Sequence, residues 1–380
     1  MNVEHKIKFY PVGNGDNTLI KLYDGTTILT DCQIRSSKED SNGVKIYDVK
    51  SDLLNEVKRD SQGYPYVDLF ILTHPHKDHC LGFSGNFYTG NPADYSNTNK
   101  TEGAIIIGEL WITQKIFHTD IVSDANEIRK EANRRIRLAR DKDSNRFKSG
   151  NCVKIIGYND NDKTEDGLHY RPGECVNTFN GLVNDYLEIF IHSPFKKSLA
   201  ISHADNDENI ASIVYQARFK LIKNGKVESR VIIAGDADHY VFDEIVKISE
   251  GNSNNDYLRW DLLLAPHHSS WSFYNDTPYR ENPKPMDSAK AFLDYGEDGA
   301  YIVASSEDIK DNDINPPSFP ARKEYVKAVG ANYFYCTGSN GGVNAPKPLI
   351  FTIGKGGISR SATNNSSNLV SAPIPRAGRR

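Results

Sequence analysis

Short apolar stretches separated by polar turns recur along the first hundred residues. Apolar and polar positions alternate on both sides of the turn Gly13–Asp16, which predicts a pair of strands, and the next apolar run ends on Asp31. Apolar positions then recur at helical spacing before a longer apolar run. The predicted strands are residues 6–10, 18–22, 27–30 and 67–73, and the predicted helix is 44–60. Strands that alternate with a helix favour a layered α/β domain.

The rest of the chain continues this alternation. A polar hairpin turn at Lys223–Lys226 separates two predicted strands. Strands are predicted at 105–113, 186–192, 212–215, 230–234, 261–265, 300–304, 332–336 and 349–352, and helices at 121–141 and 320–329. We therefore predict one domain over residues 1–355, with an insertion at about 115–182 that holds the basic helix and a polar loop at 158–182. Residues 356–380 are rich in Ser, Asn, Pro and Arg, which predicts a disordered tail.

Composition narrows the class of protein. The 380 residues are 38% hydrophobic and 25% charged, with a net charge of -4, which is typical of a soluble globular protein. Such a chain does not coat nucleic acid by bulk charge, so any nucleic-acid binding requires a local patch. We expect a cytoplasmic protein without a membrane segment, because no apolar run has the length of a span and residues 1–6 lack the apolar core of a signal peptide. The five cysteines have no CxxC spacing, which favours reduced thiols.

The segment directly after the predicted strand 67–73 concentrates metal-binding side chains. It holds three imidazoles and a carboxylate within six residues, in the order His74-Pro75-His76-Lys77-Asp78-His79. Imidazole and carboxylate together suit Zn, Mn or Fe, and four donors on one turn exceed what one ion needs from a single loop. A histidine-rich surface patch is the alternative, but such a patch seldom follows a buried strand. The motif therefore predicts two neighbouring cations.

Further candidate ligands follow later strands. Asp236 comes just after the strand 230–234, where Gly235 leaves room for close approach, and the pair His267 and His268 follows the strand 261–265. His203 lies in a predicted loop before the strand 212–215. A histidine that only fills the core lies within an apolar run rather than after it, so these positions favour ligands.

This ordered set of motifs resembles the metallo-β-lactamase fold superfamily. Within it, the chain is most similar to the metallo-hydrolase domain of ComEC-like competence proteins, which take up DNA. The resemblance covers about residues 6–355 and implies a four-layer αββα sandwich. It depends on the His-x-His-x-Asp-His turn with Leu81-Gly82, Ser212-Ile213-Val214, Ala234-Gly235-Asp236, Ala265-Pro266-His267-His268-Ser269-Ser270, Ser305-Ser306, the segment Asn315–Pro320 and Tyr335-Cys336-Thr337-Gly338.

The resemblance also implies roles for these residues. One ion, Zn or Mn, is expected on His74, His76 and His203, and a second on Asp78, His79 and His267, with Asp236 bridging the two. Asp31 is expected either to orient a ligand histidine from behind or to be a simple turn aspartate. His268 and Asp78 are the candidate catalytic residues, with His268 free to protonate a leaving group or else held by a structural hydrogen bond.

Three positions depart from the pattern of this branch. Ser269 stands where the branch has Gly, and Phe319-Pro320 stands where it often has His-Pro. The branch also often lacks a histidine at the position of His203. If His203 is a surface residue, Asp207 or Asn209 is the alternative ligand of the first ion.

Two bound cations that activate a water predict a metal-dependent hydrolase. We expect a phosphodiesterase or nuclease that cuts DNA or RNA. The alternatives are a hydrolase of a small ester, thioester or lactone, and a metal-stabilised effector subunit of a DNA-processing or phage-defence system. A partner protein such as an NTPase fits such a system by analogy.

The basic helix offers a candidate surface for nucleic acid. Residues 127–148 hold nine Lys and Arg against four acids, in a chain whose net charge is negative. This local excess predicts either a phosphate-binding surface or a solvated helix face.

Overall fold

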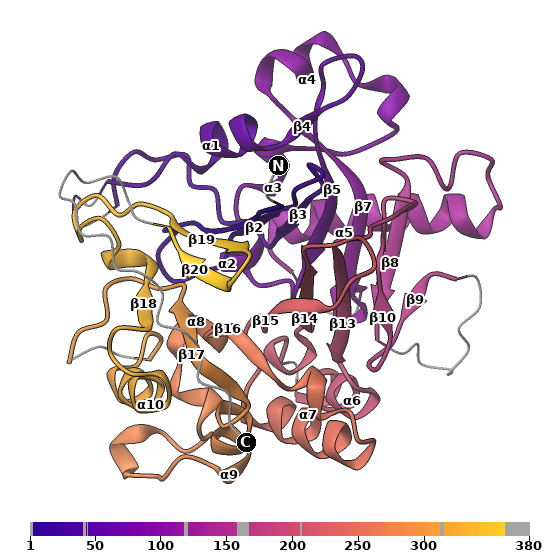
Figure 1. Cartoon of the computed structure of the whole chain (residues 1–380). Coiled ribbons are helices and arrows are strands. Elements are labelled where there is room, and N and C mark those ends of the chain that lie inside the picture. The colour runs from indigo at the N-terminus through magenta and orange to yellow at the C-terminus, as the bar shows by residue number, and fades with distance from the viewer. Residues whose placement is uncertain are drawn as a thin grey trace.

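Two β-sheets lie against each other at the centre of the molecule, and helices cover the outer face of each sheet (Figure 1). The computed structural model describes residues 3–40, 43, 45–117, 121–157, 167–205, 207–311 and 315–361, without the side chains of 203–205. This order of helices, sheet, sheet and helices is a four-layer αββα sandwich. The predicted fold class is therefore confirmed.

The first sheet is formed mainly by the N-terminal half of the chain. In order across the sheet, the strands are β20 (Gly357–Arg360), β19 (Leu349–Gly354), β1 (His5–Phe9), β2 (Thr18–Lys21), β3 (Thr27–Thr30), β5 (Pro65–Leu72), β7 (Ile105–Thr113), β8 (Cys152–Ile156) and β9 (His169–Tyr170), with β4 (Lys58–Arg59) beside β5 and β6 (Phe87–Tyr88) beside β7. The central strands β3, β5, β7 and β8 run parallel, while β1 and β2 pair antiparallel with their neighbours.

The second sheet is formed by the C-terminal half. Its first strands are antiparallel, and β15 to β18 run parallel. The order is β10 (Cys175–Val176), β13 (Leu187–Ser193), β14 (Val214–Lys220), β15 (Val227–Ile233), β16 (Trp260–Leu264), β17 (Gly296–Ala304) and β18 (Phe334–Cys336). A separate hairpin joins β11 (Thr178–Phe179) to β12 (Leu182–Val183).

Strand β5 shows how the layers are built from the sequence. Leu69 and Ile71 belong to the core between the sheets, which also contains Tyr215 of β14. Phe70 and Leu72 point to the other face and pack under the helices. Because both faces of this central parallel strand are buried, its residues 69–72 form a continuous apolar run rather than an alternating one.

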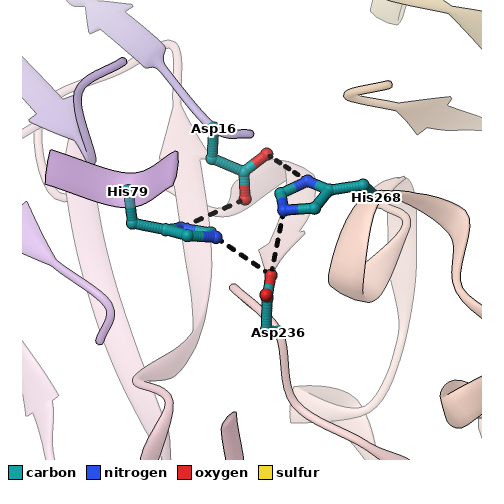
Figure 2. Close-up of side chains that lie close together, drawn as sticks. All are labelled: Asp16, His79, Asp236 and His268. Carbon is teal, nitrogen blue, oxygen red and sulfur yellow. Dashed lines mark ion pairs between the residues drawn. The ribbon is translucent and has the colours of Figure 1, made fainter. Parts of the chain in front are cut away.

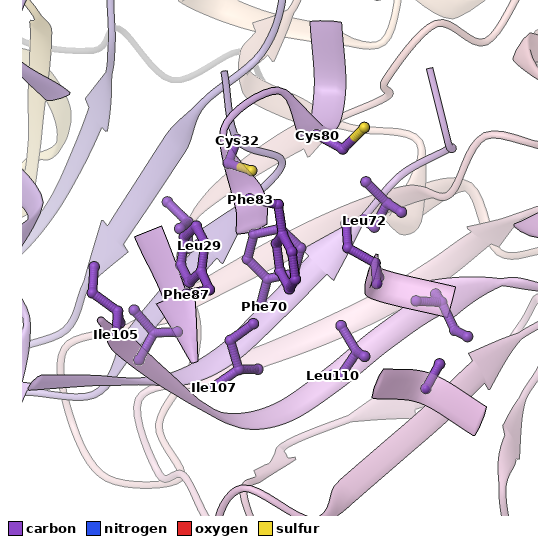
Figure 3. Packing of buried hydrophobic residues seen from close by; sticks show 14 of the residues in the cluster. Leu29, Cys32, Phe70, Leu72, Cys80, Phe83, Phe87, Ile105, Ile107 and Leu110 are labelled. Carbon is purple, nitrogen blue, oxygen red and sulfur yellow. The ribbon is translucent and has the colours of Figure 1, made fainter. Parts of the chain in front are cut away.

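The first sheet is covered by α1 (Val49–Glu56), α3 (Phe83–Asn86) and α5 (Ser123–Arg140). Apolar residues of α5 recur every three or four positions on its buried face, as Ala125, Ile128, Ala132 and Ile136. Under α3, the rings of Phe83 and Phe87 stack with their centroids 5.1 Å apart, against Phe70 (Figure 3). This packing fixes the chain immediately after the histidine-rich turn.

The second sheet is covered by α7 (His239–Gly251), α9 (Asp287–Leu293) and α10 (Phe319–Val329). The other helical segments are α2 (Lys77–Cys80), α4 (Asn97–Glu102), α6 (Lys196–Asp205) and α8 (Pro266–Ser269). Among the helices of the described residues, none combines the length and apolar character that crossing a membrane requires.

Most predicted strands are present, and three predictions need correction. Residues 357–360, assigned to a disordered tail, form β20 and pair antiparallel with β19; residues 362–380 of that tail lie outside the described part. The region 158–182, predicted as a loop, contains β9, β10 and β11; its residues 158–166 lie outside the described part. The segment of His203, predicted as a loop, belongs to α6.

Candidate metal centre

The candidate ligands lie beyond the carboxyl ends of parallel strands in both sheets. Asp31 follows β3 and His74 follows β5 in the first sheet. Asp236 follows β15, and His267 and His268 follow β16, in the second. Parallel strands end along the same edge of a sheet, so each sheet delivers its ligands to one place.

The loops of the two sheets meet at Gly235. Its φ of +50° is in the left-handed region, and a Cβ built there would lie 2.8 Å from the Cβ of Thr73. The backbone N–H of Ile213 donates to the carbonyl of Thr73 over 3.0 Å, which joins the sheets at this point. Only glycine allows so close an approach. The prediction that Gly235 leaves room beside Asp236 is confirmed.

The histidine-rich turn is held from behind by a buried carboxylate. Asp31 accepts hydrogen bonds from the backbone N–H and the hydroxyl of Thr73, each over 2.7 Å. Its Oδ2 lies 2.8 Å from Nδ1 of His79, which leaves Nε2 of His79 directed towards Asp236. Asp31 therefore orients a candidate ligand histidine, as predicted.

One group of candidate ligands gathers around Oδ2 of Asp236. This oxygen lies 3.5 Å from Nε2 of His74 and 3.6 Å from Nε2 of His267. Nδ1 of His76 lies 3.0 Å from Nε2 of His74, and Nε2 of His76 lies 3.2 Å from Glu208. Ligand atoms of His74, His76 and Asp236 lie within 4.8 Å of one another, close enough to share one cation.

A second group gathers around Oδ1 of Asp236 (Figure 2). This oxygen lies 3.0 Å from Nε2 of His79 and 3.4 Å from Nε2 of His268. The carboxylate of Asp16 completes the group, 3.7 Å from Nδ1 of His268 and 3.9 Å from Nδ1 of His79. All four residues are buried. Asp78 lies at the rim of this group, 3.2 Å from Nε2 of His268.

Asp236 thus lies between two groups of donors and offers one carboxylate oxygen to each. This is the position that a bridging carboxylate requires. The grouping of the histidines differs from the prediction, however. His267, expected with His79, lies on the His74 side, and His268, expected as a free proton donor, lies inside the second group with its ring buried.

The backbone after β16 explains this difference. His267, His268 and Ser269 have consecutive φ values of 48°, 53° and 66°. Left-handed conformations cost a residue with a side chain about 1–2 kcal/mol each, so this turn is strained. This left-handed conformation directs the rings of His267 and His268 towards opposite carboxylate oxygens of Asp236.

Several polar atoms of the second group are buried without a hydrogen-bond partner among the described residues. They are Nε2 of His79, Oδ1 of Asp236 and both ring nitrogens of His268. A buried polar atom left without a partner costs about 1–3 kcal/mol. Imidazole nitrogens and carboxylate oxygens are the ligands that Zn and Mn take. The donor set therefore fits a divalent cation.

Burial sets the protonation of several of these groups. It lowers the pKa of His74 to about 3, so that its imidazole is neutral and keeps a lone pair for a cation. It also lowers the pKa of His267. For Asp16, burial raises the pKa to about 6.

The carboxylates make the centre attractive to positive charge. Burial lowers the pKa of His79, but Asp236 and Asp31 outweigh it and raise that pKa above its ordinary value. Burial likewise opposes charge on His268, yet Asp236 and Asp78 help to raise its pKa. The imidazoles around Asp236 in turn lower its pKa although burial raises it. A cation in this place would satisfy the same carboxylates.

Asp16 is the member of the site that sequence reasoning missed. It lies in a polar turn between two predicted strands, where aspartate is common because its side chain accepts hydrogen bonds from the turn's own backbone. The signal was its position, because the turn that joins β1 to β2 lies at the same edge of the sheet as the end of β3, which Asp31 follows. Its backbone N–H donates to the carbonyl of Asp78 over 3.2 Å, which ties this loop to the histidine-rich turn.

The predicted ligand His203 lies outside the part whose side chains are described. Asp207, one of its alternatives, accepts a hydrogen bond from the N–H of Asn209, the other alternative. In the same segment it is Glu208 that reaches the site, through His76.

The basic helix α5 uses two of its arginines structurally. Arg135 is buried and donates to Glu131 and to the carbonyls of Ile107 and Cys152. Arg134 also pairs with Glu131. Both side chains attach the helix to the first sheet. The alternatives of a phosphate-binding surface and a solvated face therefore concern the exposed cations of the helix, and not Arg135.

Comparisons with known proteins identify no family for this chain. No family model matches the chain, and no curated protein matches it. Among solved structures, the chain is similar to a long form RNase Z from yeast, with 10% sequence identity and a TM-score of 0.36 over 82% of this chain. The chain spans only 38% of that protein.

Proposed function

We propose that this protein is a metal-dependent hydrolase that binds two divalent cations, Zn or Mn, and cleaves phosphodiester bonds in DNA or RNA. The position of Asp236 supports the proposal most. Each of its carboxylate oxygens faces a separate group of imidazoles, 3.0–3.6 Å away. A single structural cation would not need two such groups.

The residues divide into two ligand sets in this proposal. Asp236 belongs to both sets. His74, His76 and His267 would hold one cation, and Asp16, His79 and His268 the other, with Asp78 at its rim. When bound, a pair of divalent cations polarises a phosphoryl oxygen and makes a water molecule a better nucleophile.

The less buried residues mark the side from which a substrate would approach. The side chains of His76, Asp78 and His267 are 38%, 35% and 22% exposed, whereas Asp236 and His268 are buried. Substrate would reach the centre along this rim. Burial raises the pKa of Asp78, but His268 and His79 outweigh it and keep that pKa below its ordinary value, so Asp78 is an ionised carboxylate 3.2 Å from Nε2 of His268.

Metal analysis of the purified protein, followed by incubation with labelled single- and double-stranded DNA and RNA, tests the proposal. We expect cleavage that requires added Zn or Mn and that Asp236→Ala abolishes, together with loss of bound metal. Asp287→Asn, which changes a fully exposed carboxylate on α9, is the control and should cleave as wild type does.

Other outcomes separate the alternatives. Hydrolysis of a small ester, thioester or lactone, without cleavage of any nucleic acid, would replace the phosphodiester substrate with the small-molecule one. Bound metal without turnover of any diester or ester would indicate an effector subunit. Nucleic-acid cleavage that persists in Asp236→Ala would remove the shared carboxylate from the mechanism.

A further inference from the structure

A groove of about 760 Å³ lies beside the candidate metal centre, lined by the segment 34–38, the start of α1 and the segment 81–86. We propose that this groove binds the sugar-phosphate backbone of a single nucleic-acid strand, with Arg35, Lys38 and Lys50 as its phosphate contacts. This inference rests on the proposed function and names the surface that selects its substrate.

The groove is continuous with the loops that carry the candidate ligands. Leu81 lines it and follows His79 by two residues. The N–H of Cys32 donates to the carbonyl of His79 over 2.9 Å, and the N–H of Ile34 donates to that of Leu81 over 2.8 Å. The two hydrogen-bonded segments 31–34 and 79–81 therefore begin at the metal centre, with Asp31 and His79, and end in the wall of the groove.

Arg35 connects the groove to the loop of Asp16. A Cβ built on Gly13 would lie 2.6 Å from Nη2 of Arg35, so the guanidinium lies against this glycine, three residues before Asp16. The φ of Gly13 is +87°, a conformation that residues with side chains rarely adopt. Arg35 also lines a neighbouring cavity of about 270 Å³. Gly13 lines that cavity and not the groove, so the guanidinium of Arg35 lies at the boundary between the two. The cavity balances its three cationic side chains with three acidic ones, and we therefore assign the strand to the larger groove.

The cations of the groove are not used by the protein's own acids. None of Arg35, Lys38 and Lys50 forms an ion pair with a carboxylate of the described chain, and Lys50 donates to the carbonyl of Gly85 over 3.4 Å. Guanidinium and ammonium groups that line a groove without an ion-pair partner are suited to bind phosphate oxygens.

The two acidic side chains that line the groove point to protein donors. Asp48 accepts from the N–H and the hydroxyl of Ser51, over 3.0 and 2.7 Å. Asp124 accepts from the N–H groups of Gly82 and Ser84, over 3.0 and 2.9 Å. Three cations against two acids held in this way give the groove a net positive charge.

Further groups in the wall fit a single strand. The exposed hydroxyls of Ser36 and Ser37 are donors for phosphate oxygens. Tyr47, which packs half-buried against the core, also lines the groove. A cationic groove is typical of proteins that bind single strands without sequence preference.

The test measures binding of fluorescently labelled single-stranded DNA and RNA oligonucleotides to the full chain by anisotropy. For Arg35→Gln/Lys38→Gln/Lys50→Gln, we expect at least about tenfold weaker binding at low salt, and a salt slope reduced by about 0.7 for each lost phosphate contact. Hydrolysis of the small diester bis(p-nitrophenyl) phosphate should stay at the wild-type rate, because the groove lies beside the metal centre and not in it.

The matched control removes the same charge elsewhere. Lys130→Gln/Arg137→Gln/Arg140→Gln changes three exposed cations of α5 and should bind as wild type does. Equal losses in both triple variants, or no loss in the groove variant, would overturn the proposal, as would the absence of single-strand binding by the wild type. Since Arg35 is half-buried, Lys38→Gln/Lys50→Gln is the second variant and should show part of the same loss.

The small diester separates this inference from the proposed function. Wild-type hydrolysis of that diester with unchanged oligonucleotide binding by the groove variant would refute the groove alone. Failure of the metal-loaded wild type to hydrolyse any diester would refute the proposed function itself.

Discussion

At the scale of single residues, the turn His267–Ser269 shows how backbone conformation decides the chemistry of side chains. Three consecutive residues with left-handed φ values place two adjacent imidazoles on opposite sides of one carboxylate. An extended or helical backbone would direct only one of the two rings inwards. The strain of the turn is offset by the packing of both sheets around it.

Ser269 is the residue of this turn whose side chain contributes least. Its φ is 66°, it is fully buried, and its hydroxyl has no hydrogen-bond partner among the described residues. Replacement by Gly relieves the left-handed strain, at the expense of greater freedom in the unfolded chain. We expect Ser269→Gly to stabilise the fold by about 1 kcal/mol, a rise in Tm of about 2 °C. Thermal unfolding measures this.

The neighbouring position supplies the control. Ser270 has an ordinary φ of -68°, and its hydroxyl accepts from the N–H of Ser272 over 3.1 Å. Ser270→Gly should therefore lower the Tm. If Ser269→Gly lowers it by as much, the turn is not strained in the way that its φ values indicate.

At this scale, the sequence predicts the site residues whose residue type is unusual for their position in the chain. Three histidines after a buried strand have no common structural explanation, so His74, His76 and His79 could be predicted. Asp16 could not, because an aspartate in a turn is ordinary. The grouping of His267 and His268 depends on left-handed backbone at residues with side chains, which no pattern of residue types indicates.

At the scale of elements, prediction succeeded where burial alone decides the structure. Strands β3 and β7 begin and end at the predicted residues, since each is an apolar run bounded by polar turns. Prediction failed at β20, whose polar residues become a strand only because β19 lies beside them. The sequence also contains no sign that Arg135 of α5 is buried, because the carbonyls to which it donates come from distant strands.

Arg135 of α5 carries the clearest prediction at this scale. Its guanidinium is buried, pairs with Glu131 over 2.7 Å and donates to carbonyls of β7 and β8. Arg135→Gln leaves these acceptors with fewer donors. Breaking a buried pair costs about 3–5 kcal/mol, and the second partner of Glu131, Arg134, should keep the loss near the lower value. Urea unfolding measures the change.

The exposed Arg137 on the same helix is the matched control. Arg137→Gln should change the free energy of unfolding by less than about 0.5 kcal/mol. Equal destabilisation by both variants would mean that helix propensity or overall charge, and not the buried contacts of Arg135, holds α5 on the sheet.

At the scale of the whole molecule, the candidate centre joins the two halves of the sandwich. The first sheet and its loops supply Asp16, His74 and His79, and the second supplies Asp236 and His268. Neither half has a complete set of ligands, so a cation bound here contacts both sheets. The sequence could predict that strand ends in both halves carry ligands, but the distances between those ends follow only from the packing of the whole core.

Metal binding should therefore stabilise the entire fold and not only the local loops. A ligand that binds only the folded state contributes RT ln(1 + [L]/Kd), or about 2.7 kcal/mol at 100 times Kd. We expect a chelator to lower the Tm of the wild type by several degrees, and added Zn or Mn to restore it. Asp236→Ala removes the carboxylate shared by both groups, so its Tm should no longer respond to chelator or cation. Asp287→Asn, exposed on α9, should keep the full response. If Asp236→Ala responded as strongly as the wild type, the stabilising cation would have to bind elsewhere, and the centre between the sheets would not hold the two halves together.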